Sequence, residues 1–312
     1  MNRQKIILDC DPGHDDAVAI MLAVSSPKIE LLGITVTAGN QTLEKTTQNA
    51  CKVLQWIGAE AIPVYPGCPR PIIKEPFIAD FIHGETGLDG PVFPPLSKTA
   101  EDEHAVNYMI RTLLESDGDI IVVTTGPMTN LAMAIRMEPK ILDKIKRIVL
   151  MGGAVANGNV SPAAEYNIWA DAEAAHICFN SGRPVTMVGL DVTRKVLCYP
   201  EIVDRMANVG TCASRLFADL LYHFCKTQKE VFGYEGGPLH DPVTIAYLIE
   251  PELLTTEPMN ATVEIRSDES YGRTNCDPFD FLGRPKNVDV ATDIDVEGFW
   301  NLIEGELSRF EK

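Results

Sequence analysis

The chain has 312 residues, 45% of them hydrophobic and 23% charged, a composition typical of a globular protein with a sizeable core. Its formal charge of −17 argues against nucleic acid or an anionic membrane as a partner, because both need a basic surface. The eight Cys are scattered without a CxxC pair, no signal peptide opens the chain, and no apolar run could span a bilayer, so we expect a cytoplasmic protein.

The first two thirds of the chain alternate strand-like and helix-like segments. Continuous apolar runs predict buried strands at 5–8, 31–36, 62–65, 119–124, 145–151 and 185–190. Helices are predicted at 17–24 and 43–57. Buried strands between helices indicate an α/β fold with a mostly parallel central sheet flanked by helices. We expect a single domain, residues 1–312.

The remaining segments are less regular. Residues 66–98 are rich in Pro and Gly and predict a long loop. Residues 262–265 and 288–291 predict strands of a small antiparallel extension near the C-terminus. Helices are predicted at 217–233, 243–249 and 296–310.

The stretch from Asp9 to Asp16 places four carboxylates at a strand-to-helix turn. In open α/β sheets, ligands bind at the carboxyl ends of the strands. Helix capping explains one or two of these acids, with Asp11 as N-cap and Asp15 and Asp16 in the first turn. Four acids together repel one another, and a divalent cation such as Ca²⁺ or Mg²⁺ relieves that repulsion.

Four other segments carry polar residues that fit this cluster. Asn40 follows the second strand, and Thr125 ends the strand at 119–124 with a free backbone carbonyl. Segment 159–168 contains two Asn and a Glu, and His240-Asp241 opens a helix. Each has a structural reading: a turn Asn, a surface acid, an N-cap Asp and a satisfied His. Their joint occurrence favours a site.

These motifs together resemble one family. The order DPGHDD, AGN, TTGPMTNLA, LMGGA, AEYNIWAD and PLHDP, over nearly the whole chain, is similar to the inosine–uridine-preferring nucleoside hydrolases. Segments 83–90 and 262–290 look most like the bacterial pyrimidine-specific members. The resemblance implies the nucleoside hydrolase fold and Ca²⁺-dependent hydrolysis of the N-glycosidic bond of a ribonucleoside. It also implies a homo-oligomer, a tetramer or a dimer, in nucleoside salvage.

The resemblance assigns roles by position. It implies Ca²⁺ ligands at Asp11, Asp16, the Thr125 carbonyl and Asp241, and makes Asp11 the general base that takes a proton from the attacking water. It implies contacts to the ribose hydroxyls and the metal at Asp15, Asn40, Asn167 and Asp241, and further ribose contacts at Asn159 and Glu165. It implies a pocket-wall contact at Met151 and a residue near the leaving base at His240. Asp9 receives no role beyond support.

The base side of the site is less specific in sequence. Helix 217–233 is expected to line it, with Gln228 as a polar contact, and His83 and His240 are the candidates to protonate or hydrogen-bond the leaving base. Phe224 and Phe232 stand where related pyrimidine-specific enzymes carry a Thr and a Tyr. The resemblance favours uridine and cytidine as substrates, with inosine possible. The loss of those two hydroxyls argues against strict pyrimidine specificity, because a site with fewer donors discriminates less, so a nonspecific purine and pyrimidine hydrolase is the alternative.

Two further readings differ in class. Asp9 and Asp11 also resemble the signature of haloacid-dehalogenase phosphatases, but that family has Thr or Val where Gly13 stands. A metal-dependent phosphohydrolase would release phosphate from a phosphomonoester. A non-catalytic nucleoside-binding protein on the same fold would lack a catalytic group, and none is missing. An EF-hand loop is excluded by the positions of Pro12 and Gly13.

Overall fold

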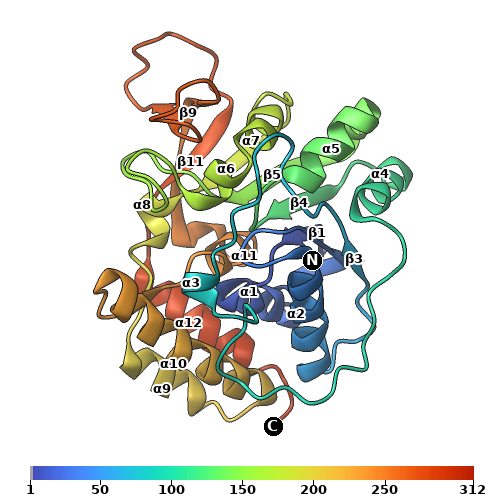
Figure 1. Ribbon diagram of the computed structural model, residues 1–312, viewed down its shortest axis with the longest axis vertical. Helices are drawn as coiled ribbons and strands as arrows, with labels where there is room; N and C mark the ends of the chain where they lie inside the picture. Colours follow the sequence, from blue (N-terminus) through green and yellow to red (C-terminus); the bar gives the residue numbers. More distant parts are fainter. Residues whose placement is uncertain (1–2) are drawn as a thin grey trace.

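A computed structural model describes residues 3–312 (Figure 1). Strands lie at β1 Gln4–Cys10, β2 Ile29–Val36, β3 Val64–Pro66, β4 Ile120–Thr124, β5 Ile145–Met151, β6 Val185–Val188, β7 Leu197–Cys198, β8 Gly237–Pro238, β9 Leu254–Val263, β10 Thr274–Asp277 and β11 Val288–Ile294. Helices lie at α1 His14–Ser25, α2 Leu43–Trp56, α3 Asp80–His83, α4 Ala105–Glu115, α5 Thr129–Met137, α6 Tyr166–Ala170, α7 Ala172–Phe179, α8 Leu190–Thr193, α9 Pro200–Ala207, α10 Cys212–Phe232, α11 Pro242–Ile249 and α12 Val296–Leu307, with short 3₁₀ turns at Pro139–Lys144 and Pro251–Leu253.

The central sheet has nine strands in the order β10-β9-β11-β6-β5-β4-β1-β2-β3. Neighbouring strands in the run β6-β5-β4-β1-β2-β3 pair in parallel, and β11 pairs in parallel with β6. Strand β9 pairs antiparallel with both β11 and β10. The predicted α/β class, parallel sheet and antiparallel extension are therefore confirmed.

Helices cover both faces of the sheet, as Figure 1 shows. Alternate residues of β1 enter the two cores: Ile6 and Leu8 pack with α1, α2 and α9 to α12, and Ile7 packs with α4, α5 and α7. This alternation follows from the strand period of two. Among residues 3–312, no helix combines the length and the apolarity needed to cross a membrane.

Several element boundaries differ from the predicted ones. The strand predicted at 185–190 stops at Val188, because Gly189 begins the turn into α8. The strand predicted at 262–265 is the end of β9, which begins at Leu254. Its polar residues and Pro258 hide it from a hydrophobic pattern. The loop predicted at 66–98 contains only the end of β3 and the four-residue α3.

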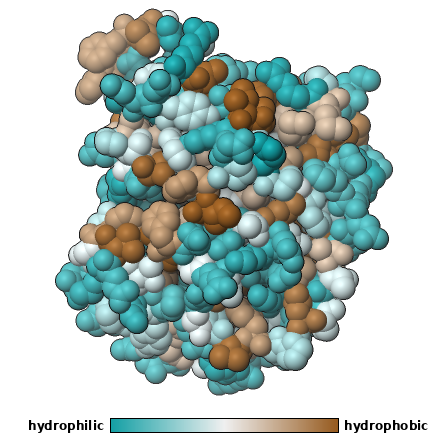
Figure 2. Space-filling view, in the orientation of Figure 1, coloured by the Kyte–Doolittle hydropathy of each residue, from teal (hydrophilic) through white to brown (hydrophobic). Residues whose placement is uncertain are grey.

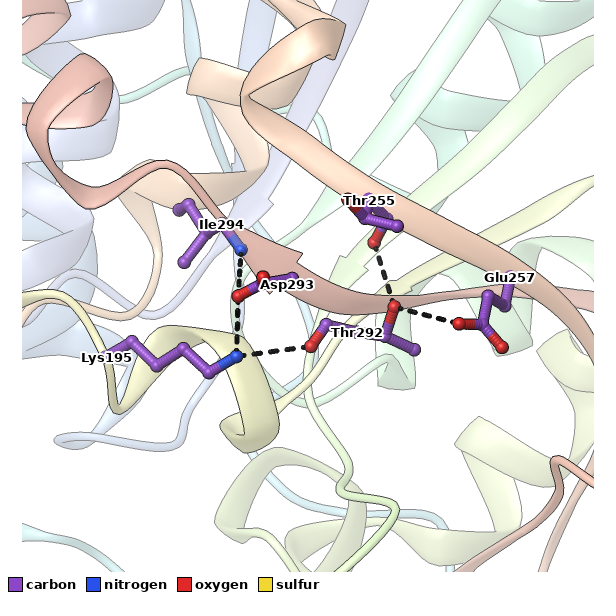
Figure 3. Close-up of polar contacts among 6 residues, drawn as sticks. All are labelled: Lys195, Thr255, Glu257, Thr292, Asp293 and Ile294. Atoms are coloured by element: carbon purple, nitrogen blue, oxygen red, sulfur yellow. Dashed lines mark hydrogen bonds and ion pairs between the residues drawn. The ribbon is translucent and has the colours of Figure 1, made fainter.

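A bulge fastens the antiparallel edge to the segment after α8 (Figure 3). The register between β11 and β9 shifts between Ala291 and Asp293, which leaves Thr292 as the extra residue. Lys195 donates to the Thr292 carbonyl at 3.3 Å and to the Asp293 carboxylate at 2.7 Å. The end of α8 is thereby anchored to the sheet.

Removing a side chain from the central strand tests the packing of this core. Leu8 is fully buried on β1, so Leu8→Ala should lower the free energy of unfolding by ~2–5 kcal/mol, through lost burial and a residual cavity. Urea unfolding followed by circular dichroism measures this. Val92 is 90% exposed, and Val92→Ala should change the free energy by less than ~0.5 kcal/mol. Equal effects of the two variants would contradict the assignment of Leu8 to the core.

Candidate active site

A cavity of about 300 Å³ lies at the carboxyl ends of the parallel strands. Strand β1 pairs in parallel with β2 on one side and with β4 on the other, so the order in which strands are added to the sheet reverses there, which is where open α/β sheets bind ligands. Eleven of the residues predicted from the sequence line this cavity: Asp15, Asn40, His83, Thr125, Met151, Asn159, Glu165, Asn167, Gln228, His240 and Asp241. The other two, Asp11 and Asp16, are fully buried beside it.

The start of α1 places its acids. The N-cap is Gly13 rather than Asp11, so Asp11 does not cap the helix as the capping alternative supposed. Asp16 does act partly as a cap, because its Oδ2 accepts from the Gly13 N–H at 3.0 Å. The same carboxylate accepts from Asn40 Nδ2 at 3.1 Å and from Thr125 Oγ1 at 2.8 Å. It therefore joins the ends of β1, β2 and β4.

Asp11 occupies a space that two glycines leave open. Its Oδ2 accepts from the Asn40 N–H at 2.7 Å, whereas Oδ1 is buried without a hydrogen-bond partner. A Cβ at Gly39 would collide with Oδ2, and a Cβ at Gly126 would collide with Oδ1. The Gly of AGN and the Gly of TTGP therefore make room for this carboxylate, a role beyond that of turn residues.

The carboxylates that converge most closely belong to Asp15, Asp16 and Asp241, with one oxygen of each within 4.8 Å of the others. Burial, together with the charge of the neighbouring Asp16, raises the pKa of Asp15 to about 7. Burial raises the pKa of Asp241 well above its usual value, and the charges of Asp15, Asp16 and Asp11 add to this. Asp241 lies at the N-cap of α11 but accepts no capping hydrogen bond there, so capping does not explain it.

The donor set fits a divalent cation that prefers oxygen. Three converging carboxylates and a buried carboxylate oxygen without a partner are costly without a positive charge. The Thr125 carbonyl accepts from Asn167 Nδ2 at 2.8 Å, and its second lone pair remains for another ligand. Asp15 belongs to this convergent group, whereas Asp11 lies beside it, a division that the sequence did not indicate.

Asn159, Glu165 and Asn167 contribute polar atoms to the cavity, some of them unused within the protein. Asn167 uses both amide hydrogens, on the carbonyls of Thr125 at 2.8 Å and Met151 at 3.1 Å, so its Oδ1 remains as an acceptor. The Glu165 carboxylate accepts from three backbone N–H groups at 2.9 to 3.2 Å. Burial nonetheless raises the pKa of Glu165 to about 7. Asn159 accepts from the Tyr166 N–H at 2.8 Å, which fixes its amide in the cavity wall.

Another part of the cavity lining is aromatic. Phe224, Gln228 and Phe232 of α10 line it, together with Tyr234, which the sequence did not single out. Phe224 is 1% exposed and is both core residue and cavity wall, whereas Phe232 is 45% exposed. Gln228 is 4% exposed, and its Oε1 has no hydrogen-bond partner. A flat aromatic wall with an unused amide suits a nucleobase.

Two neutral imidazoles also line the cavity. Burial lowers the pKa of His240 to about 3, and it lowers the pKa of His83 well below its usual value. His240 Nδ1 lies 2.7 Å from Thr193 Oγ1, and His83 Nδ1 lies 3.2 Å from His14 Nδ1. Each ring is therefore held by a second residue that the sequence did not identify as part of the site.

The segment around α8 also holds the loop that carries Asn159. The Asp191 carboxylate accepts from the N–H groups of Val155 at 2.6 Å and Ala156 at 3.1 Å. Arg194 donates to the next two carbonyls, of Asn157 at 2.9 Å and Gly158 at 2.6 Å. In the sequence this segment marks only the turn after a strand, and no local motif reveals that it holds a distant loop.

Asp9 lies outside the cavity, at 1% exposure. Its Oδ1 accepts from Thr35 Oγ1 at 2.7 Å and Asn130 Nδ2 at 2.8 Å. Asn130 also donates to the Val36 carbonyl at 3.0 Å, so it ties the β1 and β2 ends to α5. This is the supporting position expected for Asp9, and it does not suit the reacting carboxylate of a phosphohydrolase.

Comparisons with known proteins agree with this geometry. Residues 6–301 match the family described as inosine-uridine preferring nucleoside hydrolase. The pyrimidine-specific ribonucleoside hydrolase RihB of Escherichia coli O17:K52:H18 is 53% identical over 304 residues, 97% of each chain. The RihB of Escherichia fergusonii is 52% identical over the same share.

A solved structure has the same fold. The purine-preferring ribonucleoside hydrolase from Gardnerella vaginalis superposes with a TM-score of 0.91 at 38% identity, over 97% of this chain and 98% of that one. That enzyme is purine-preferring, whereas the two RihB relatives are pyrimidine-specific, so membership of the family does not determine the preferred base. The cavity, its carboxylate floor and these matches together lead to one conclusion: the chain belongs to the inosine–uridine preferring nucleoside hydrolase family.

Proposed function

We propose that this protein hydrolyses the N-glycosidic bond of ribonucleosides to ribose and free base, with uridine and cytidine favoured and inosine a poorer substrate. The observation that carries the proposal is a single cavity that is bordered by converging carboxylates and also lined by aromatic residues. The pyrimidine preference rests on the 53% identity to a pyrimidine-specific relative, against 38% to a purine-preferring one.

Ca²⁺ is the proposed cofactor, held by Asp11, Asp16, Asp241 and the Thr125 carbonyl, with Asp15 adjoining. When bound, a divalent cation there would polarise the attacking water and neutralise the repulsion between the acids. The residues of the chain supply the rest. Asp11 has a raised pKa from burial and from the charge of Asp16, which makes it a stronger base toward the water.

The ribose would be held by the acceptors left on Asn167, Asn40 and Glu165. The Glu165 carboxylate has about four lone-pair sites and uses three on backbone N–H groups, so one remains for a hydroxyl. Cleavage develops positive charge on the sugar, as in other glycoside hydrolysis, and the surrounding carboxylates favour that charge. Contacts that hold the ribose hydroxyls would supply binding energy that stabilises the transition state at the anomeric carbon.

The leaving base would lie against Phe224, with His83, His240 and Gln228 at its edge. Both imidazoles are neutral at pH 7, so they meet the base as hydrogen-bonding groups rather than as cations. His240 can present an N–H to the base when the Thr193 hydroxyl donates to its Nδ1. We also propose a cytoplasmic location, which the free thiols of all eight Cys support.

A homo-oligomer is also part of this proposal. The loop between β10 and β11 projects from the body (Figure 1), and its tip is apolar in colour in Figure 2. Phe279, Phe281 and Leu282 are 74%, 82% and 60% exposed there. Adjacent apolar side chains at a projecting tip favour burial against a second copy of the chain.

Product analysis tests the reaction. Purified protein with Ca²⁺ should release free base and ribose from uridine and cytidine faster than from inosine, and EDTA should abolish release, because the acids then lack their counter-charge. Chromatography of the bases and a reducing-sugar assay measure both products. Phosphate release from a phosphomonoester, without base release from any nucleoside, would favour the phosphohydrolase instead.

Asp11→Asn tests the general base. The amide oxygen can still accept from the Asn40 N–H, but the basic oxygen is lost, so kcat should fall by ~10²–10⁴ with the fold intact. Asp9→Asn is the matched control, since its Oδ1 can keep both of its donors outside the cavity. We expect that control to retain kcat within about tenfold. Equal losses in the two variants would assign Asp11 a structural role only.

The oligomer is tested by size-exclusion chromatography with light scattering. The wild type should elute as a dimer or tetramer, and the double variant Phe279→Ser/Phe281→Ser should shift toward the monomer, because it loses apolar contact area. Ile73→Ser, at a position 70% exposed in the 66–98 loop, is the control and should not shift. A monomeric wild type would refute this part of the proposal.

A further inference from the structure

Uracil and cytosine present opposite hydrogen-bonding edges. The 4-position of uracil is a carbonyl that accepts, whereas that of cytosine is an amino group that donates. The neighbouring N3 is reversed in the same way, a donor in uracil and an acceptor in cytosine. A site that takes both nucleosides therefore needs groups that can exchange donor and acceptor roles.

His83 is placed to meet that edge. A Cβ on Gly13 would lie 2.6 Å from His83 Nδ1 and 2.7 Å from Cε1, so this side of the ring faces the start of α1. The other side, with Nε2, is left for the cavity that His83 lines. The ring stacks on Phe224 with centroids 5.7 Å apart, within the aromatic wall. Whether Nε2 donates or accepts depends on what Nδ1 does.

His14 holds a fixed tautomer behind His83. It is fully buried, and its Nε2 lies 2.8 Å from the Asp89 carbonyl, which can only accept. Nε2 of His14 therefore carries a proton. The ring is fully buried and its hydrogen-bond partners are a carbonyl and another imidazole, so neither partner offsets the cost of a positive charge there. A neutral ring protonated on Nε2 has a lone pair on Nδ1, directed at His83.

His14 thus offers His83 Nδ1 two different partners. The ring Nδ1, at 3.2 Å, is an acceptor, and the backbone N–H, at 3.3 Å, is a donor. If His83 carries its proton on Nδ1, it pairs with the His14 ring and presents a lone pair to the cavity. If the proton is on Nε2, Nδ1 pairs with the backbone N–H and the cavity meets a donor. Neither neutral tautomer leaves Nδ1 unpaired.

Gln228 can also either donate or accept a hydrogen bond. Its amide carries both a carbonyl and an NH₂ group, and its buried Oε1 has no partner in the protein. Rotation of the amide exchanges the two. The base side of the cavity therefore has two buried groups that can each donate or accept.

We propose that His14 is a positioning residue that keeps both neutral tautomers of His83 available, so that one site accepts the 4-oxo edge of uridine and the 4-amino edge of cytidine. This rests on the proposed function. His14 does not touch the substrate; it acts through His83, from the position between Gly13 and Asp15.

The variant His14→Phe removes one of the two partners of His83 Nδ1 and keeps the other. Phe keeps the aromatic stack with Phe224 and the backbone N–H, but it removes the ring acceptor, so His83 is held with its proton on Nε2. Uridine still finds a donor, whereas the cytidine amino group meets another donor. We expect the ratio of kcat/KM for cytidine to that for uridine to fall about tenfold.

His223→Phe is the matched control. His223 stacks on His14 with centroids 5.7 Å apart, on α10, so the change perturbs the same aromatic stack. The cytidine-to-uridine ratio should stay at the wild-type value. His14→Gln, whose amide supplies an acceptor, should restore the ratio toward that value. A ratio that is unchanged in His14→Phe, or that changes equally in His223→Phe, would overturn the proposal.

A second measurement does not depend on how well His14→Phe folds. Nitrogen-15 NMR of the inactive Asp11→Asn variant distinguishes the two tautomers of His83 in its complexes with uridine and with cytidine. We expect the proton on Nε2 with uridine and on Nδ1 with cytidine; one tautomer in both complexes would refute the proposal. A wild type that cleaves neither nucleoside refutes the proposed function itself, an outcome distinct from either result.

Discussion

The repulsion between buried carboxylates is the constraint on which the rest of this structure depends. Asp15, Asp16 and Asp241 converge within 4.8 Å, and Asp11 lies buried beside them. Desolvation and like charge both oppose ionisation there. The surrounding chain offsets the cost in part: backbone N–H groups, the Asn40 amide and the Thr125 hydroxyl all donate to these acids. The remaining repulsion would be relieved by a bound cation, so these acids form a candidate metal site.

The sheet topology brings these groups together. Acids from the end of β1, an amide from the end of β2 and a hydroxyl from the end of β4 meet because parallel strands end at the same edge. Asp241 comes from a helix more than two hundred residues later in the chain. The two glycines that flank Asp11 are required by this crowding, since any side chain at either position would occupy the volume of the carboxylate.

Much of this could be predicted from the sequence, for a physical reason. Buried parallel strands are continuous apolar runs, so the sheet can be predicted from local patterns, and the polar residues that follow each run stand out as candidates for a site. Strand β9 was found only at its end, because its alternating polar residues resemble a loop. The contacts of Thr193 with His240 and of Arg194 with the loop at 157–158 could not be predicted. They join segments with no periodic relation, and only the packed chain brings them together.

The segment around α8 has a dynamic consequence. Asp191 holds two amides of the loop before Asn159, Arg194 holds the following two carbonyls, and Thr193 holds His240. Movement of the loop at 155–158 away from α8 would break the four bonds to Asp191 and Arg194 together. In hydrogen exchange, the amides of Val155 and Ala156 would therefore open together with those of α8, as one cooperative unit. The part of the cavity wall that carries Asn159 and the part that carries His240 then fluctuate in concert.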